Sequence, residues 1–178
     1  MIDTPRLLLR PYALTDFDAI HALRSDAETM RFIGGKALTR EESWQRLMRA
    51  AGHWALLGFG FFVVVEKAGG RVIGEAGLMR AERGLGEQFD PYPEAGWLLS
   101  PQGRGHGYAQ EAMRAALAWF AESHGPSRSV CIIDPANAAS LRLAQKLGYK
   151  AFGTTHYKDS EVTMLERGGR PGESERRE

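Results

Sequence analysis

Several features that would place a chain in a specialised class are scarce or missing in this sequence. Cysteine occurs once in 178 residues, at Cys131, which excludes an internal disulfide. A single cysteine permits no CxxC pair and the five histidines form no HExxH spacing, so no metal site is recognisable. The 23 basic and 22 acidic residues almost cancel, and such a chain has no overall field that would attract nucleic acid or an anionic membrane.

The two ends of the chain also lack targeting or membrane segments. The opening, MIDTPRLLLRPY, has only a short apolar run broken by arginines, which is neither a signal peptide nor a membrane span. Residues 168–178 contain no apolar residue to bury, which predicts a flexible tail. Residues 1–167 then form one domain, and the low cysteine usage indicates a cytoplasmic protein with no nucleic-acid or membrane partner.

The hydrophobic pattern of the rest predicts strands and helices in a mixed order. Alternating or β-branched runs predict strands at 6–12, 60–67, 69–79, 94–100, 127–134, 149–157 and 160–167. Helical spacing predicts helices at 14–26, at 38–57, from about residue 108 to Phe120, and at 137–147. Thr39 and Glu42 form a capping-box pattern, 60–79 a hairpin, and 80–93 a loop long enough to contact a substrate.

The segment SPQGRGHGYAQEA, residues 100–112, places three glycines at alternate positions directly before a helix. Glycine lets backbone N–H groups approach a ligand closely, and the first helical turn offers unpaired N–H groups and a partial positive charge. A P-loop is excluded because no Lys-Ser or Lys-Thr follows a glycine. A Rossmann fingerprint is excluded because Tyr108 or Gln110 occupies the place of the third glycine. A diphosphate held by the N–H groups of residues 103–109 fits the pattern, and a plain turn into a helix is the structural alternative.

Three stretches of the chain resemble one family. QGRGHGYA resembles the Q/R-x-x-G-x-G/A signature of the GNAT superfamily of N-acetyltransferases, and it follows a strand and precedes a helix as in that family. NAASLRLAQKLGYK, residues 137–150, resembles the family segment N-x-x-S/A-x-x-L-x-x-K-L-G-F. Residues 4–20 resemble the opening of the ribosomal-protein alanine N-acetyltransferase branch. The likeness spans roughly residues 3–166, with the stretches in the expected order.

The resemblance implies a single-domain α/β acetyl-CoA enzyme with a mixed, mostly antiparallel sheet flanked by helices. The strands at 94–100 and 128–134 are expected to splay apart and admit the pantetheine arm of coenzyme A. Arg104 and Lys146 are expected to meet phosphate oxygens. The residues assigned to coenzyme binding are Trp97, Leu98, Leu99, Gln102, Gly103, Arg104, Gly105, His106, Gly107, Tyr108, Ala109, Asn137 and Lys146.

Acetyl transfer to an amine requires a neutral amine, a polarised thioester carbonyl and a proton for the departing thiolate. Glu94, near the start of the strand that leads into the glycines, is the first candidate base, and Glu75 on the neighbouring strand is the second. Either could instead be an exposed carboxylate paired with an arginine. Ser140 matches the serine that stabilises the leaving sulfur in the resembling branch. Asn137 matches the residue that contacts pantetheine, although asparagine there is also an ordinary helix cap. The tyrosine that many members use to protonate the thiolate is replaced by Ala144.

The sequence therefore predicts an N-acetyltransferase that moves an acetyl group from acetyl-CoA to a primary amine by direct attack, without a metal. The acceptor is a protein N-terminus or a small amine, and residues 32–40 and 80–93 are expected to line its side of the site. Two alternatives stay open: a CoA-binding sensor or interaction protein that has lost catalysis, and a nucleotide-binding module of another fold. An exposed strand edge, which this fold often leaves, favours a homodimer.

Overall fold

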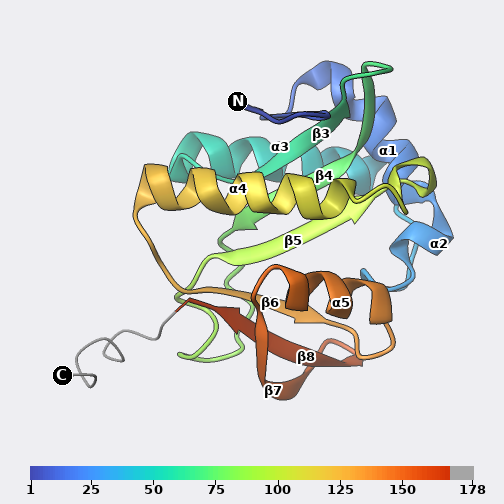
Figure 1. Cartoon of the computed structure of the whole chain (residues 1–178). Helices are drawn as coiled ribbons and strands as arrows, with labels where there is room; N and C mark the ends of the chain where they lie inside the picture. Colours follow the sequence, from blue (N-terminus) through green and yellow to red (C-terminus); the bar gives the residue numbers. More distant parts are fainter. Residues whose placement is uncertain (169–178) are drawn as a thin grey trace.

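One eight-stranded sheet organises the computed structural model, which describes residues 1–168 (Figure 1). Its strands lie in the order β1-β2-β3-β4-β5-β6-β8-β7, and neighbouring strands are antiparallel except β5 and β6. The mixed, mostly antiparallel sheet expected from the sequence is confirmed. The strands are β1 (Ile2–Asp3), β2 (Leu7–Arg10), β3 (Phe61–Glu66), β4 (Arg71–Met79), β5 (Glu94–Leu99), β6 (Ser129–Ile133), β7 (Lys150–Tyr157) and β8 (Ser160–Arg167).

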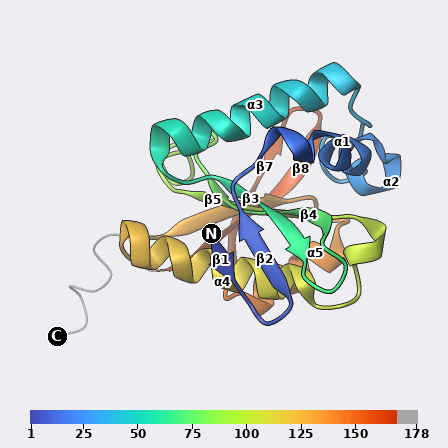
Figure 2. The same cartoon turned by 90° about the horizontal axis from the view of Figure 1, so that it is seen from above.

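Helices cover both faces of the sheet. Figure 2 shows α1 and α3 on one face and α4 and α5 on the other, which gives three layers. The α-helices are α1 (Phe17–Ser25), α2 (Ala27–Met30), α3 (Arg40–Leu57), α4 (Tyr108–His124) and α5 (Ala138–Lys146), and two short 3₁₀ helices are η1 (Leu14–Asp16) and η2 (Pro101–Gly103).

Local capping explains where the helices agree with the predictions and where they differ. The capping box of α3 is present: the Thr39 hydroxyl accepts the Glu42 N–H at 3.2 Å, and the Glu42 carboxylate accepts the Thr39 N–H at 2.7 Å. The helix predicted at 14–26 begins instead as the 3₁₀ helix η1, in which the Asp16 N–H donates to the Ala13 carbonyl, three residues before it, at 3.0 Å. The Asp16 carboxylate accepts the Ala13 N–H at 2.7 Å and so holds the same turn. The single turn α2, which Asp26 caps, was not predicted, since it is too short to show a period.

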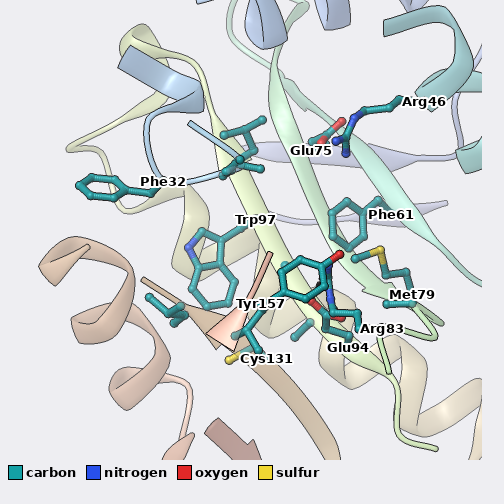
Figure 3. A pocket seen from close by; sticks show the side chains of 18 of the residues that line it. Phe32, Arg46, Phe61, Glu75, Met79, Arg83, Glu94, Trp97, Cys131 and Tyr157 are labelled. Carbon is teal, nitrogen blue, oxygen red and sulfur yellow. Dashed lines mark hydrogen bonds and ion pairs between the residues drawn. The ribbon is translucent and has the colours of Figure 1, made fainter. Parts of the chain in front are cut away.

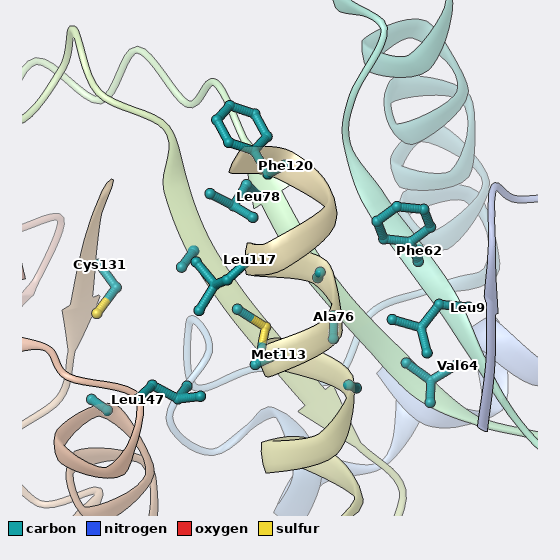
Figure 4. Packing of buried hydrophobic residues seen from close by; sticks show 14 of the residues in the cluster. Leu9, Phe62, Val64, Ala76, Leu78, Met113, Leu117, Phe120, Cys131 and Leu147 are labelled. Atoms are coloured by element: carbon teal, nitrogen blue, oxygen red, sulfur yellow. The ribbon is translucent and has the colours of Figure 1, made fainter. Parts of the chain in front are cut away.

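The apolar stripe predicted for α4 is confirmed as core. Met113, Leu117 and Phe120 are buried against the sheet, where they join Phe62 and Ala76 in one cluster (Figure 4). Burial of large apolar side chains of this kind contributes about 1.5–3 kcal/mol each. The packing fixes α4 along the sheet, and residues 100–107, which include η2 and the glycine loop, connect the end of β5 to its first turn (Figure 1).

Several predictions concern features beyond the core. Within residues 1–168, no helix combines the length and the apolar character needed to cross a membrane. The predicted tail lies outside the described residues, apart from Gly168. The two edges of the sheet are β1 and β7, and a homodimer through a strand edge stays a prediction.

Candidate active site

β5 and β6 run side by side only where both begin. Within residues 1–168 they share the single register pair Glu94 with Val130, next to a 3.0 Å hydrogen bond from the Val130 N–H to the Pro93 carbonyl. Beyond this pair the two strands diverge, as Figure 1 shows. The splay that the resemblance implied is therefore present in the sheet.

The diverging edge of β5 presents backbone polar groups to this gap. The Ser100 N–H donates to the Ile73 carbonyl at 2.9 Å, at the end of the pairing between β5 and β4. In an antiparallel pair every second residue directs its N–H and C=O to the partner strand, so Leu98, two residues before Ser100, also directs these groups to β4. Because hydrogen bonding alternates along a strand, the backbone groups of Ala95 and Trp97 face away from β4: those of Ala95 lie where β5 still pairs with β6, and the N–H and C=O of Trp97 point toward the gap. An extended ligand with amide groups can pair with this edge as a further strand would.

A cleft of about 550 Å³ opens beside the gap and reaches the sheet face that α1 and α3 cover (Figure 3). This volume is in the usual range for small-molecule sites. Both segments predicted to line the acceptor side contribute, through residues 32–35 and through Arg80, Ala81 and Arg83. The structure also brings six predicted site residues together in the lining: Glu75, Glu94, Trp97, Leu98, Asn137 and Ser140.

Glu75 lies at the α1 side of the cleft and is 1% exposed. One carboxylate oxygen accepts the Arg24 guanidinium, and the other accepts the Tyr12 hydroxyl at 2.8 Å. Burial and the charge of Glu75 raise the pKa of Tyr12 well above its usual value, so Tyr12 stays a hydrogen-bond donor. Glu75 is thus paired with an arginine, as the alternative interpretation expected, but it is buried rather than exposed.

Glu94 is 4% exposed and forms a bidentate ion pair with Arg83. The Arg83 Nε and Nη2 donate to the two carboxylate oxygens at 2.6 and 2.7 Å. Burial raises the pKa of Glu94 above its ordinary value, and the bonds from Arg83 offset part of this rise. The Tyr157 ring lies 4.7 Å from the Arg83 guanidinium carbon, which closes this end of the cleft (Figure 3).

Ser140 and Trp97 meet across the gap between α5 and β5. The Trp97 indole N–H donates to the Ser140 hydroxyl oxygen at 3.2 Å, so the serine keeps its own proton for another acceptor. The Asn137 side-chain oxygen accepts the Ser140 N–H at 3.1 Å and caps α5, which confirms the structural interpretation of Asn137. Cys131 lines the gap from β6, and burial raises the pKa of its thiol far above the ordinary value. The thiol is therefore neutral and behaves as a small core residue.

The glycine loop lies at the far end of β5 and is not part of the cleft lining. Gly103 packs closely, since a Cβ there would lie 3.2 Å from the Ile73 carbonyl oxygen. Gly105 and Gly107 have φ values of +80° and +77°, and a Cβ on Gly105 would meet no atom within 4 Å. Gly107 caps α4, so the N–H groups of residues 108–110 have no acceptor within the helix.

The Arg104 guanidinium contacts the protein. Its Nε donates to the Leu99 carbonyl at 3.1 Å and its Nη2 to the Thr29 hydroxyl at 2.7 Å, and its Nη1 lies 3.6 Å from the Glu28 carboxylate. These bonds use only part of the five N–H donors of the guanidinium, so a phosphate contact from Arg104 stays a prediction. Gln102 and Lys146 are exposed, the latter in the last turn of α5.

The loop and the first residue of α4 are also anchored on the side of β2 and β3, through the His106 carbonyl and the Tyr108 side chain. The His106 carbonyl accepts the Arg6 Nη1 at 2.9 Å, and the Tyr108 hydroxyl donates to Glu66 at 2.9 Å. The Arg6 guanidinium also lies over the Tyr108 ring. These contacts hold the loop from behind. Within residues 1–168, the N–H groups of Gly105, His106 and Gly107 and those of the first turn of α4 have no acceptor.

Several polar residues of the cleft were not singled out individually from the sequence, among them Tyr12, Arg24, Arg46, Arg83 and Tyr157. They come from separate segments, and no spacing in the chain connects them. The one local signal was the position of Arg83 in the Gly- and Pro-rich residues 80–93.

Comparisons with known proteins agree with this geometry. Residues 6–150 match the family model described as the acetyltransferase (GNAT) domain. An uncharacterized N-acetyltransferase of Bacillus subtilis is 28% identical over 152 residues, which cover 85% of this chain and 84% of that protein. The solved structure of a GNAT-family acetyltransferase from Bordetella pertussis is 34% identical, with a TM-score of 0.85 over 94% of this chain and 98% of that chain. A ribosomal L7/L12 alpha-N-protein acetyltransferase, solved in complex with coenzyme A, shares the fold at 16% identity, with a TM-score of 0.75 over 92% of this chain and 94% of that chain.

Proposed function

Because the chain belongs to the GNAT family of acetyltransferases, we propose that it moves an acetyl group from acetyl-CoA to a primary amine held in the cleft. The observation that carries this proposal is the divergence of β5 from β6 beside the buried carboxylate of Glu94. The gap provides a place for the thioester, and the cleft brings an amine to the same place from the other side.

The residues around the gap fit acetyl-CoA. The free N–H and C=O of Trp97 suit the amides of the pantetheine arm. The unpaired N–H groups of the α4 first turn, with Gly105 and Gly107 ahead of them, suit the diphosphate. The ribosomal L7/L12 acetyltransferase of the same fold was solved with coenzyme A, which supports this assignment. Acetyl-CoA would supply the acetyl group as a thioester.

Glu94 is the proposed general base. At pH 7 about one α-amine in ten is neutral, whereas only about one lysine-like amine in two thousand is neutral. A lysine-like acceptor therefore depends more strongly on a general base than an α-amine does. Burial makes the Glu94 carboxylate more basic than an ordinary glutamate, and a more basic carboxylate accepts a proton more readily. Glu75 is the second choice because it lies at the α1 side of the cleft, bonded to Arg24 and Tyr12, whereas Glu94 lies where β5 and β6 begin to diverge.

Ser140 is the proposed stabiliser of the leaving sulfur. The amine nitrogen bonds to the carbonyl carbon, the carbon–sulfur bond breaks, and the sulfur takes up the electron pair and later a proton. The Ser140 hydroxyl accepts the Trp97 indole N–H and can direct its own proton at this sulfur. A thiol with a pKa of about 8.5 needs only such modest help, which accommodates alanine at position 144.

Thiol release from acetyl-CoA in the presence of an amine panel tests the function. The panel contains peptides with free N-termini and small amines, and the proteins are wild type, Glu94→Gln, Glu75→Gln and the exposed control Glu122→Gln. We expect amine-dependent release, lowered about 100-fold or more in kcat by Glu94→Gln and unchanged by Glu122→Gln. Thermal unfolding is recorded in parallel, because Glu94→Gln also weakens the pair with Arg83.

The same measurements distinguish the alternatives. Stabilisation by acetyl-CoA with no turnover of any amine would indicate a CoA-binding sensor rather than an enzyme. Stabilisation by NAD or ATP in place of acetyl-CoA would indicate a nucleotide-binding module and would contradict the proposal.

A further inference from the structure

Arg46 is a cation of the cleft that has no carboxylate of its own. It projects from the middle of α3, is half-buried, and lies beside Glu75 (Figure 3). Among the described residues it forms neither a hydrogen bond nor an ion pair, although it interacts electrostatically with Glu75 and Arg24. The charge of Arg46 is therefore held in the site without a protein group that neutralises it directly.

The surroundings of Arg46 are short of hydrogen-bond acceptors. Both oxygens of Glu75 are taken by Arg24 and Tyr12. Arg24 in turn keeps its Nε buried, with no acceptor among the residues that the structure describes. Of these two guanidinium groups, Arg24 binds the Glu75 carboxylate and Arg46 binds no carboxylate among the described residues, and each has donors left over.

The lining of the cleft as a whole is also basic. Its charged side chains comprise seven arginines and lysines and only four aspartates and glutamates, and two of those four are paired with Arg24 and Arg83. This local excess of positive charge stands in a chain that is almost neutral overall. A cleft with such a lining concentrates anionic ligands.

Keeping Arg46 in this position has a cost. Burial lowers the pKa of Arg46, and the neighbouring cations Arg24 and Arg49 lower it further, whereas Glu75 raises it. A cation that is partly removed from water and lies near other cations destabilises the free protein, and a bound anion would remove that cost.

We propose that the acceptor is an amine that also carries a carboxylate, which Arg46 binds while the amino group faces the thioester. This inference rests on the proposed acetyl transfer and names the substrate class of the same site. Two sources share the chemistry: a free amino acid, and a peptide N-terminus with an acidic residue close behind it. Polyamines, which carry only positive charge, should be poor acceptors.

Matched acceptors test the inference. β-Alanine is compared with β-alaninamide, the peptide amide Ser-Asp-Ala with Ser-Asn-Ala, and spermidine serves as the polycation, all at saturating acetyl-CoA. We expect at least a tenfold higher kcat/KM for the anionic member of one pair, about 1.4 kcal/mol, and the pair that shows it identifies the source. Spermidine as the best acceptor, or equal use of both members in both pairs, overturns the inference and leaves acetyl transfer standing.

Variants connect the preference to Arg46. Arg46→Gln should abolish the preference mainly through KM, and Arg46→Lys should retain part of it. Arg40→Gln, on the same helix but outside the cleft lining, should keep it in full. The preference should also shrink as salt is added, because screening weakens the attraction. An Arg46→Gln protein that still prefers the anionic acceptors would overturn the assignment to Arg46.

A binding measurement makes the inference independent of turnover. Calorimetry with CoA present compares N-acetyl-β-alanine and N-acetyl-Ser-Asp-Ala amide with their uncharged counterparts. At least a tenfold tighter binding of one charged product, lost in Arg46→Gln, supports the inference. If the protein shows this binding but acetylates none of the acceptors, the proposed function fails and the anion site at Arg46 stands. No binding, or equal binding within both pairs, overturns the inference.

Discussion

Replacing Gly105 with alanine tests whether the glycine loop holds a diphosphate. Gly105 has a φ of +80°, and an added Cβ would meet no protein atom within 4 Å. The substitution therefore introduces backbone strain and one methyl group that faces open space, without a clash inside the protein. If phosphate oxygens approach the loop amides there, the methyl group holds them away.

Gly125, at the opposite end of α4, is the matched control. Its φ is +83°, and a Cβ there would also meet nothing within 4 Å. Its ψ of 158° puts it in a region that essentially only glycine occupies, where a side chain costs about 1–3 kcal/mol. Gly105→Ala should cost about 1–2 kcal/mol. The two substitutions thus have destabilising effects of similar size, so a loss of affinity caused by lower stability alone should be similar in Gly125→Ala and Gly105→Ala.

The expected magnitudes separate the two effects. For a chain of this size each 1 kcal/mol corresponds to about 2–4 °C in Tm, so both variants should melt several degrees below wild type. Loss of one N–H bond to a charged phosphate is worth about 1.5–3 kcal/mol, which predicts an acetyl-CoA affinity roughly 10- to 150-fold weaker for Gly105→Ala alone. Isothermal titration with acetyl-CoA and CoA, at a temperature where both variants are folded, measures this. Equal affinity in Gly105→Ala and wild type, or an equal loss in both variants, would refute the assignment of the diphosphate to this loop.

Three further predictions concern other parts of the site. Ser140→Ala should lower kcat about 100-fold while the affinity for acetyl-CoA stays unchanged, and an unaltered kcat in single-turnover experiments would remove Ser140 from the mechanism. Arg46→Met should raise the melting temperature by about 2–4 °C, which corresponds to a gain in the free energy of unfolding near 1 kcal/mol. The reason is that burial lowers the pKa of Arg46, so its charge is costly in the folded state. A lower melting temperature in calorimetric scans would contradict this. Burial raises the pKa of Asp16, but the bonds from Arg10 and Ala13 outweigh it, so that the pKa lies below its ordinary value. The ionised carboxylate therefore stabilises the fold at any pH above the ordinary aspartate pKa. This contribution is lost as the pH falls through the lowered pKa of the folded protein. Asp16→Asn should therefore be about 2–3 kcal/mol less stable at pH 7, and urea titrations at decreasing pH should show the difference shrinking.

The parts of the fold that the sequence predicted are those whose causes are local. The capping box of Thr39 and Glu42 and the apolar stripe of α4 each lie within a few helical turns, so the period and the residue types suffice to locate them. The splay of β5 from β6 has no such local cause. It depends on where two distant segments pair, at Glu94 and Val130, and only the family resemblance made it predictable.

The two halves of the site differ in the same respect. The loop proposed for the diphosphate lies at one strand-to-helix turn, so its glycines at residues 103, 105 and 107 fall within five consecutive positions of the sequence. The acceptor cleft is instead lined by residues of separate segments, among them Tyr12, α1, α3, β4, β5, β6 and two loops, and its chemistry lies in which arginines find a carboxylate. Arg24 and Arg83 do, and Arg46 does not, although all three look alike in the sequence. A residue's charge can be read from the chain, but its neutralisation is decided by the tertiary structure. The proposed acceptor preference could therefore be inferred only from the folded cleft.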